Sequence, residues 1–342
     1  MLYVTTRDNA QPQTAFRALS ESRGEDGGLY LPLRLGPLSP EEIAGLKEKS
    51  FGEAAAQILN LFFATRLTGW DVEFAVGRYP IRLIPMSHRM VLTETWHNPD
   101  WDFARSIREM GLLVSGGNGD CPGNWGEIAI RIAFLFGIFA ELIASGELEE
   151  NAGVDVSVAS GDFSGPMAAV YARQMGLPIA NVVVCCNENS APWDLICKGE
   201  LKTGVVPIQT ALPACDHAVP EGIERLLYAC GGGKAVEEFL ARQSRGGVYF
   251  PDEETSAAMR AMLQVSVVSS KRVMSSLRNI YKTSGKVLGP YTALTWCGLM
   301  DYRARTGESR LSLVLSERSP QVDTGVVSEA MGITAEELNE RI

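Results

Sequence analysis

Residues 154–186, VDVSVASGDFSGPMAAVYARQMGLPIANVVVCC, decide the class of this fold. The runs VDVSVA and NVVVCC are short, apolar and rich in valine, which is typical of strands buried in a sheet. SGDFSG between them is a glycine loop, and PMAAVYARQMG is a helix that starts with Pro166 and ends with Gly176. Because strand, loop, helix and strand follow one another, we expect a βαβ unit and an α/β fold.

Further helices and strands are expected on both sides of this unit. SPEEIAGLKEK has Ser39 as N-cap and Pro40 at the first helical position. IAIRIAFLFGIFAELIA predicts a buried helix, because Arg131 and Glu141 interrupt it as a membrane span. The patterns also predict helices at 220–229, 234–243, 252–264, 269–283 and 290–304, a last helix capped by Thr334, and strands at 311–315 and within 81–96, broken at Pro85.

The composition of the 342 residues excludes some classes of function. A formal net charge of −10 argues against nucleic-acid binding through phosphate contacts. The N-terminus has no apolar signal segment, and the seven cysteines include no CxxC pair. We therefore expect a cytoplasmic protein with reduced, mostly buried thiols and no membrane partner.

The loop at 160–165 is the clearest candidate binding site. A glycine loop before a helix exposes backbone N–H groups and the positive end of the helix dipole, which suits phosphate or another small anion. It matches neither G-x-G-x-x-G nor the P-loop, and Asp162 adds a negative charge where an anion would bind, so a plain tight turn is an equal alternative. The residues of the candidate anion site are Ser160, Gly161, Asp162, Phe163, Ser164 and Gly165.

Other stretches point less clearly to chemistry. GGNGDCPGNWGE at 116–127 allows close approach of a ligand, with a flexible connection as the alternative, and ACGGGKAVEEF favours a loop between helices. CDH at 215–217 lacks the further ligands of a zinc site, and no G-x-S-x-G motif occurs, so we expect neither a metal nor a hydrolase triad.

The turn TETWHNPDWDFARSIREM at 93–110 gathers polar residues in front of a helix. Asp100 and Asp102 form a candidate carboxylate pair, but acids before a helix more often cap it and interact with its dipole. The residues available here for new chemistry are His97, Asp100, Asp102 and Arg105, with His97 as the candidate acid or base.

Several stretches, taken in order, resemble the threonine synthase family of pyridoxal-phosphate enzymes. VTTRDNAQPQTAFRALSESRGEDGGLYLP at 4–32 is similar to the family's opening, and SGDFSGPMAAVYARQMGLPIANVVVCCNEN at 160–189 to its cofactor-phosphate loop. LKTG, GIERLLY, DEETSAAMR and GPYTA follow in the family order. The resemblance implies a tryptophan-synthase-β-like fold (fold type II), with an N-terminal α+β domain at 1–90 and an α/β domain at 91–342.

Two departures from the family pattern concern its chemistry. Where the family reads H-G-P-T-x-x-F-K-D, this chain reads HNPDWDFAR at 97–105, so Ala104 stands at the position of the Schiff-base lysine. The family's helix start S-I-N-W-A-R resembles PGNWGE at 122–127, with Glu127 in place of the arginine. This spacing implies that most of the family's small domain is missing around residues 105–123.

These departures predict a threonine-synthase-like protein that does not make threonine. A lysine amine is needed for the Schiff base, and Arg105 cannot replace it because its guanidinium stays protonated. We expect no cofactor, and either a regulatory pseudoenzyme that binds a small anionic or phosphorylated ligand or a repurposed enzyme that works without pyridoxal phosphate. The surface left by the missing domain allows a homo-oligomer. Further cleft candidates are Asn124, Asn187, Asn189 and Thr292.

Two alternatives remain open. The first is a pyridoxal-phosphate enzyme of the threonine synthase or lyase type, completed by a partner chain. The second is a structural subunit whose cleft is filled by its own side chains, with Trp96, Trp101 and Trp125 as the candidates.

Overall fold

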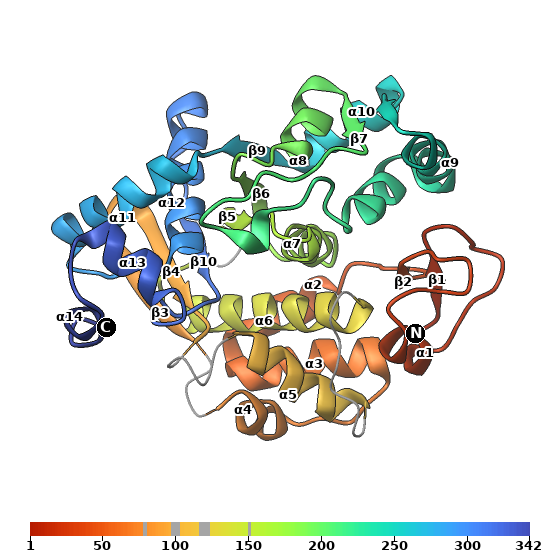
Figure 1. Cartoon of the computed structure of the whole chain (residues 1–342). Helices are drawn as coiled ribbons and strands as arrows, with labels where there is room; N and C mark the ends of the chain where they lie inside the picture. Colours follow the sequence, from red (N-terminus) through yellow and green to blue (C-terminus); the bar gives the residue numbers. More distant parts are fainter. Residues whose placement is uncertain (78–80, 97–102, 116–123, 150–151) are drawn as a thin grey trace.

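A six-stranded sheet runs through the middle of the molecule, in the order β3-β4-β10-β5-β6-β9 (Figure 1). The computed structural model describes residues 1–77, 81–96, 103–115, 124–149 and 152–342. Five neighbouring strands, β4, β10, β5, β6 and β9, are parallel, and β3 pairs antiparallel with β4 at one edge. The strands are β3 (Arg82–Met86), β4 (Met90–Glu94), β5 (Val154–Ala159), β6 (Ile179–Cys186), β9 (Gln264–Val267) and β10 (Ser312–Ser316).

The βαβ unit expected from the sequence is confirmed. β5 and β6 are parallel neighbours, with Val156 opposite Val182, and α7 (Ser164–Gln174) connects them. β10, the last strand in the sequence, lies between β4 and β5. The carboxyl ends of β4, β10 and β5 therefore lie side by side, and ligands of open α/β sheets bind outside such ends.

Helices cover both faces of the sheet. On one face α7 packs on the strands, α6 (Trp125–Ala144) packs on α7, and α3 (Phe51–Phe63) packs on α6. On the other face lies α12 (Pro290–Thr306), with α11 (Ser270–Ser284) beside it. Along β6, Val182 and Val184 enter the core on the α7 side, whereas Val183 and Cys185 enter the core on the α12 side. This double burial explains why β6 is an uninterrupted apolar run.

The predicted helices are confirmed. Ser39 and Thr334 are the N-caps of α2 and α14, each in a capping box. The helices expected at 220–229 and 234–243 are the two parts of α9, which is interrupted at Gly232, where φ is 67° and the backbone is not helical. The remaining elements are α1 (Ala15–Ser20), α2 (Pro40–Ala44), α4 (Gly69–Val76), α5 (Phe103–Ser115), α8 (Ala191–Trp193), α9 (Ile223–Arg245), α10 (Glu253–Met262), α13 (Thr324–Met331), α14 (Ala335–Asn339), β1 (Tyr3–Thr5), β2 (Tyr30–Pro32), β7 (Leu201–Thr203) and β8 (Gly247–Tyr249).

The strand break expected at Pro85 is wrong. Pro85 lies inside β3 and opposite Val91 of β4. β3 is an edge strand, where a proline that donates no hydrogen bond is tolerated. Because β3 precedes residue 90 and pairs with β4, the sheet crosses the boundary expected between 1–90 and 91–342.

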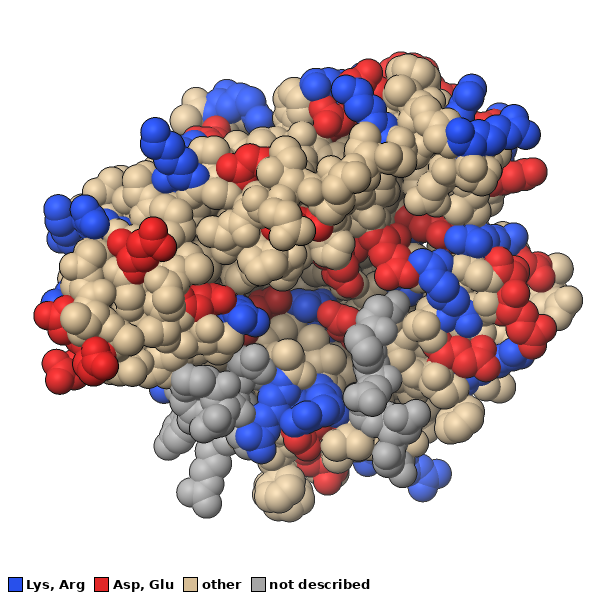
Figure 2. Space-filling model, in the orientation of Figure 1, with Lys and Arg blue, Asp and Glu red and all other residues tan. Residues whose placement is uncertain are grey.

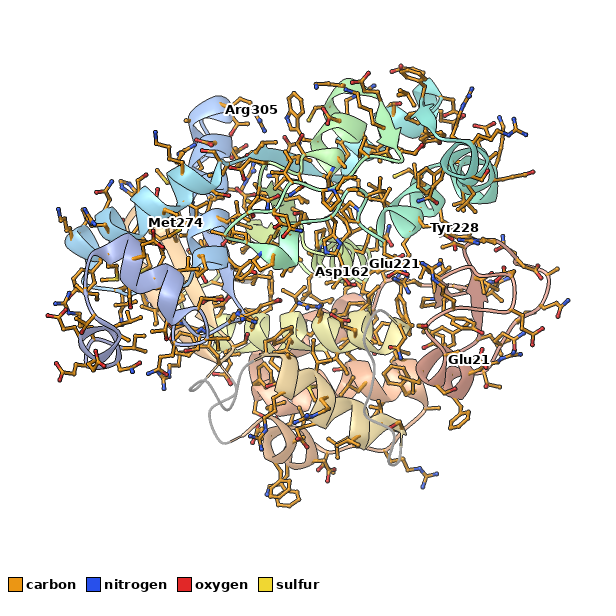
Figure 3. The ribbon with its side chains drawn as sticks, viewed as in Figure 1. Glu21, Asp162, Glu221, Tyr228, Met274 and Arg305 are labelled. Atoms are coloured by element: carbon orange, nitrogen blue, oxygen red, sulfur yellow. The ribbon has the colours of Figure 1, made fainter. Side chains whose placement is uncertain are left out.

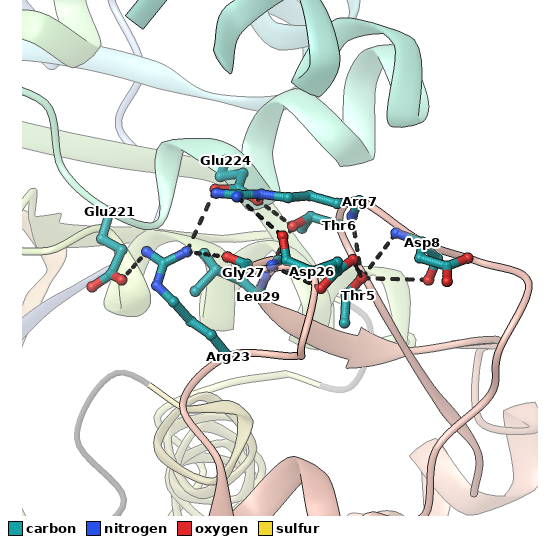
Figure 4. A network of polar contacts seen from close by, with 11 residues as sticks. Thr5, Thr6, Arg7, Asp8, Arg23, Asp26, Gly27, Leu29, Glu221 and Glu224 are labelled. Atoms are coloured by element: carbon teal, nitrogen blue, oxygen red, sulfur yellow. Dashed lines mark hydrogen bonds and ion pairs between the residues drawn. The ribbon is translucent and has the colours of Figure 1, made fainter. Parts of the chain in front are cut away.

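A largely buried ion pair holds the N-terminal segment to the first turn of α9 (Figure 4). Arg7 donates to both oxygens of the Glu224 carboxylate, from Nε at 3.0 Å and from Nη2 at 2.9 Å. The Thr6 hydroxyl donates to the same carboxylate. Arg23 pairs with Glu221, just before α9. The start of α9 is thereby fixed to the N-terminal strands.

The cysteines that the structure describes are all free thiols, and most of them are buried as expected. Cys185, Cys186, Cys215 and Cys297 are buried, and only Cys197 among the described ones is exposed. Burial raises the pKa of the Cys185 thiol to about 12. Within the described ranges, no helix has both the length and the apolar character needed to cross a membrane.

Candidate functional site

A cavity of about 360 Å³ opens at the carboxyl ends of β5 and β10. It lies where the parallel sheet is expected to bind ligands. Ser160, Gly161 and Asp162 of the glycine loop form one wall, and residues that follow β10 form another. Figure 2 shows acidic and basic side chains together in the hollow across the middle of the molecule. The lining residues are Arg131, Val158, Ala159, Ser160, Gly161, Asp162, Gly165, Ala214, Cys215, His217, Tyr291, Thr295, Leu315, Glu317 and Arg318.

The glycine loop is held by backbone hydrogen bonds, one to β6 and one within the loop. Ser160 N–H donates to the Cys185 carbonyl at 2.9 Å, and Phe163 N–H donates to the Ser160 carbonyl at 2.8 Å. Gly161 and the fully buried Phe163 both have positive φ, 45° and 77°. A left-handed conformation at a buried phenylalanine is strained, and the surrounding packing must impose it.

Gly222 supports this loop from the start of α9. Its N–H donates to the Asp162 carbonyl at 2.9 Å. A Cβ atom at this position would lie 2.9 Å from the Phe163 Cβ and 3.0 Å from the same carbonyl oxygen. Only a glycine allows the two segments to approach so closely. Figure 3 shows Asp162 close to Glu221, the residue before Gly222, above α6.

The Asp162 side chain binds the first residue of α7. One carboxylate oxygen accepts the Ser164 N–H at 2.9 Å, and the other accepts the Ser164 hydroxyl at 2.8 Å. The Ser164 amide, which an external anion would use at this helix start, is therefore bound by a carboxylate of the chain itself. This arrangement stabilises the helix start, because a negative charge interacts favourably with the dipole there.

Arg131 of α6 brings the main positive charge to the cavity. Its guanidinium pairs with Glu127 one turn earlier, at 3.1 Å, and with Glu317 after β10, at 2.5 Å. Burial acts to lower the pKa of Arg131, but the carboxylates, above all Glu317 and Glu127, raise it above its ordinary value. The guanidinium also lies 4.7 Å from the ring centre of Phe103, the first residue of α5. Arg131 is thus a fixed, fully charged group in the wall.

The remaining polar wall comes from the segment after β7 and from α12. Tyr291 hydroxyl accepts the Ala214 N–H at 3.1 Å, and burial raises the pKa of this tyrosine. Burial likewise raises the pKa of the Cys215 thiol, which keeps it protonated. His217 lines the cavity beside Cys215, and its own N–H donates to the Cys215 carbonyl.

The four further cleft candidates serve the fold, and none of them lines the cavity. Asn124 is the N-cap of α6, accepting the Gly126 N–H at 2.7 Å. Asn187 and Asn189 donate to the Asp216 carboxylate and so hold the segment 208–216 in place. Thr292 shares a hydrogen bond of 2.9 Å with Ser316 beneath the cavity.

Of the turn at 93–110 the structure describes residues 93–96 and 103–110, and His97, Asp100 and Asp102 lie outside the described residues. Phe103 N–H donates to the Glu317 carbonyl at 3.2 Å, which places the start of α5 beside the cavity. Ala104 is exposed, and neither it nor Arg105 lines the cavity. Trp96 and Trp125 are buried but are also absent from the cavity wall, and Trp101 lies outside the described residues.

Comparisons with known proteins agree on one family. Residues 2–77 match the family model described as threonine synthase N terminus. Threonine synthase of Pseudomonas aeruginosa is 27% identical over 173 residues, which are 50% of this chain and 36% of that protein. Human threonine synthase-like 1 is 25% identical over 199 residues, 57% of this chain and 26% of that protein. The chain is therefore similar to threonine synthases in its N-terminal segment and over about half of its length. The match spans only about a quarter of the threonine synthase-like 1 proteins.

Solved threonine synthases have the same fold. The pyridoxal-phosphate-bound threonine synthase of Brucella melitensis superposes with a TM-score of 0.84 at 20% identity, over 97% of this chain and 92% of that one. The yeast threonine synthase gives a TM-score of 0.84 at 17% identity, over 99% and 93% of the two chains. At these identities the likeness shows the fold alone. It confirms the expected tryptophan-synthase-β-like architecture, fold type II.

Sequence reasoning missed Arg131 and Glu317 as site residues. In the sequence Arg131 stands out only as a charge within an apolar helix, and Glu317 follows a strand 186 positions later. The charge inside an otherwise apolar helix was the available signal, because an arginine within a core is costly to bury without a carboxylate beside it.

Proposed function

We propose that this chain is a threonine-synthase-like protein that works without pyridoxal phosphate and does not make threonine. The cavity wall contains no lysine among the described residues. The chain has eight lysines, all within the described residues, and none of them lines the cavity. A Schiff base needs a primary amine, and the guanidinium groups of Arg131 and Arg318 are poor nucleophiles. No side chain of the described cavity wall can therefore hold the cofactor covalently.

Two further observations support the proposal. Asp162 occupies the amide of Ser164 at the loop that resembles the cofactor-phosphate loop, so the residues present do not fit a phosphorylated cofactor. Residues 116–124, between α5 and α6, are too few to form a domain. We propose that this short connection reflects a reduced small domain, and a cleft with less cover is more open to water, which weakens electrostatic stabilisation.

The cavity supports non-covalent binding of a small ligand. Its volume suits a metabolite, and its wall combines apolar side chains with a few polar groups in fixed positions. Arg131, Asp162, Glu317 and Tyr291 are each held by a neighbour, so they would orient a ligand at little cost in entropy. We propose a ligand-binding pseudoenzyme of regulatory type, and the proposal retains a homo-oligomer, which light scattering would test.

A turnover assay tests this function directly. The purified chain is mixed with added pyridoxal phosphate and the phosphorylated substrate of the family, and threonine and released phosphate are measured, with the Pseudomonas aeruginosa enzyme as positive control. We expect no product above the buffer rate. Turnover by the purified chain would overturn the proposal. Turnover that appears only with a co-purified second chain would favour the enzyme completed by a partner.

A further inference from the structure

We infer that Asp162 is a built-in anion, which fills the anion site at the start of α7 and excludes phosphate from the cavity. This inference rests on the proposed function only for the location of the ligand site. It assigns the choice between phosphorylated and unphosphorylated ligands to a single carboxylate of this chain.

The first support is the geometry at the helix start. Both Asp162 oxygens are hydrogen-bonded to Ser164, one to its N–H and one to its hydroxyl. A bound phosphate would use the same two donors, because the first N–H groups of a helix have no partner within the helix. α7 has eleven residues, long enough to carry the dipole that favours an anion at this end.

The second support is the positive charge around Asp162. A Cβ atom at Gly165, in the first turn of α7, would lie 4.0 Å from Nη1 of Arg131, so this guanidinium lies over the helix start. Arg225 is 1% exposed, its Nη2 has no hydrogen-bond partner, and no carboxylate forms an ion pair with it among the described residues. Burial lowers the pKa of Arg225, whereas the charges of Tyr171 and, to a smaller extent, Asp162 act to raise it.

The start of α7 has Arg131 beside it and the buried Arg225 within the reach of its charge, and such an environment suits an anion. Arg131 is already paired with Glu127 and Glu317. Arg225 has no ion-pair partner among the described residues, so its burial is costly and a negative charge at this point stabilises it. In this chain the carboxylate of Asp162 supplies that charge permanently. An entering phosphate would meet a like charge a few ångström away and would have to displace it from Ser164.

Asp162 therefore changes the class of ligand from the phosphorylated one that the resemblance implies to an unphosphorylated one. With Asp162 in place, the cavity accepts small unphosphorylated ligands, whose polar groups can reach His217, Tyr291 or the loop hydroxyl of Ser160. Without Asp162, the same loop becomes a phosphate site. The identity of one residue at the start of α7 therefore separates the two classes.

The test measures binding of inorganic phosphate by isothermal titration calorimetry at constant ionic strength. We expect no saturable heat with the wild type and saturable binding with Asp162→Ala. The affinity of the variant for phosphate should exceed that of the wild type by about tenfold or more, since the removed charge is close and partly shielded from water. Asp162→Asn keeps an acceptor for Ser164 but removes the charge, so it should gain affinity as well. It carries the same test if the alanine variant does not fold.

Two control variants locate the effect. Asp252 caps α10 in the same manner, accepting the Thr255 N–H at 2.8 Å, but no buried arginine acts on it. Asp252→Ala should therefore bind no phosphate. Adding Arg131→Gln to Asp162→Ala should abolish the gained affinity.

Two results would overturn the inference. One is phosphate binding by the wild type as tight as that of Asp162→Ala. The other is a folded Asp162 variant with no gain in affinity. Threonine formation by the purified chain would refute the proposed function but would leave these binding results unchanged, so the two failures are distinguishable.

Discussion

The ion pair between Arg7 and Glu224 offers a quantitative test of how the N-terminal segment is attached. The Glu224 side chain is 6% exposed and that of Arg7 is 28% exposed, and the carboxylate receives two hydrogen bonds from Arg7 and one from Thr6. Removal of one partner from a buried pair costs about 3–5 kcal/mol. Because water partly screens Arg7, we expect Glu224→Ala to lower the free energy of unfolding by about 2–3 kcal/mol.

The assay is urea unfolding followed by circular dichroism, with a double-mutant cycle of Arg7→Ala and Glu224→Ala. The cycle should give a coupling energy of about 1.5 kcal/mol or more, because the hydrogen bonds are charge-assisted and bidentate. Glu238→Ala is the matched control, since Glu238 lies 3.8 Å from Lys234 in an exposed pair and should change stability by less than about 0.5 kcal/mol. A loss below about 0.5 kcal/mol for Glu224→Ala, or additive single effects, would refute this reasoning.

Three further predictions concern the core, the loop and a buried carboxyl. Trp125→Ala should cost about 3–5 kcal/mol in urea unfolding, because Trp125 is fully buried against three aromatic rings; a loss below about 1 kcal/mol would contradict this packing. Gly222→Ala should cost about 1–3 kcal/mol, since its Cβ would meet Phe163, whereas Gly325→Ala, with open space around it, should be neutral or stabilising; equal effects would exclude the steric reason. Burial raises the pKa of Asp155, so its ionised form opposes folding at neutral pH, and the wild type should gain stability relative to Asp155→Asn as the pH is lowered toward the ordinary range of an aspartate; urea midpoints at pH 8 and 5 check the sign, and a relative loss on acidification would contradict it.

The fold was predictable where local signals and burial agree. The β5-α7-β6 unit has two apolar runs, a proline early in the helix and a glycine directly after its last turn, and each signal indicates the same element boundaries. Pro85 misled because sequence does not reveal which strand lies at an edge. The two helices expected around the glycines of 231–233 are separated at a single residue, because Gly232 adopts a positive φ that interrupts the helix.

The site was predictable only in its local part. The loop at 160–165 was found because a strand, glycines and a helix start adjoin in the sequence. The opposite wall comes from Arg131 and Glu317, which only tertiary structure brings together. Asn187 and Asn189 follow a strand, as cleft residues often do, but Asp216 binds them both instead. Proximity to a strand end therefore did not separate ligand contacts from structural ones.

The most direct test of the central claim is borohydride reduction of the purified chain after incubation with pyridoxal phosphate, followed by intact and peptide mass measurement. We predict no stoichiometric, saturable adduct, because none of the eight lysines faces the cavity; any label should be scattered over exposed lysines and remain far below one per chain. A single lysine labelled to completion, with a saturable change in the visible absorbance spectrum, would contradict the claim that Schiff-base chemistry has been lost.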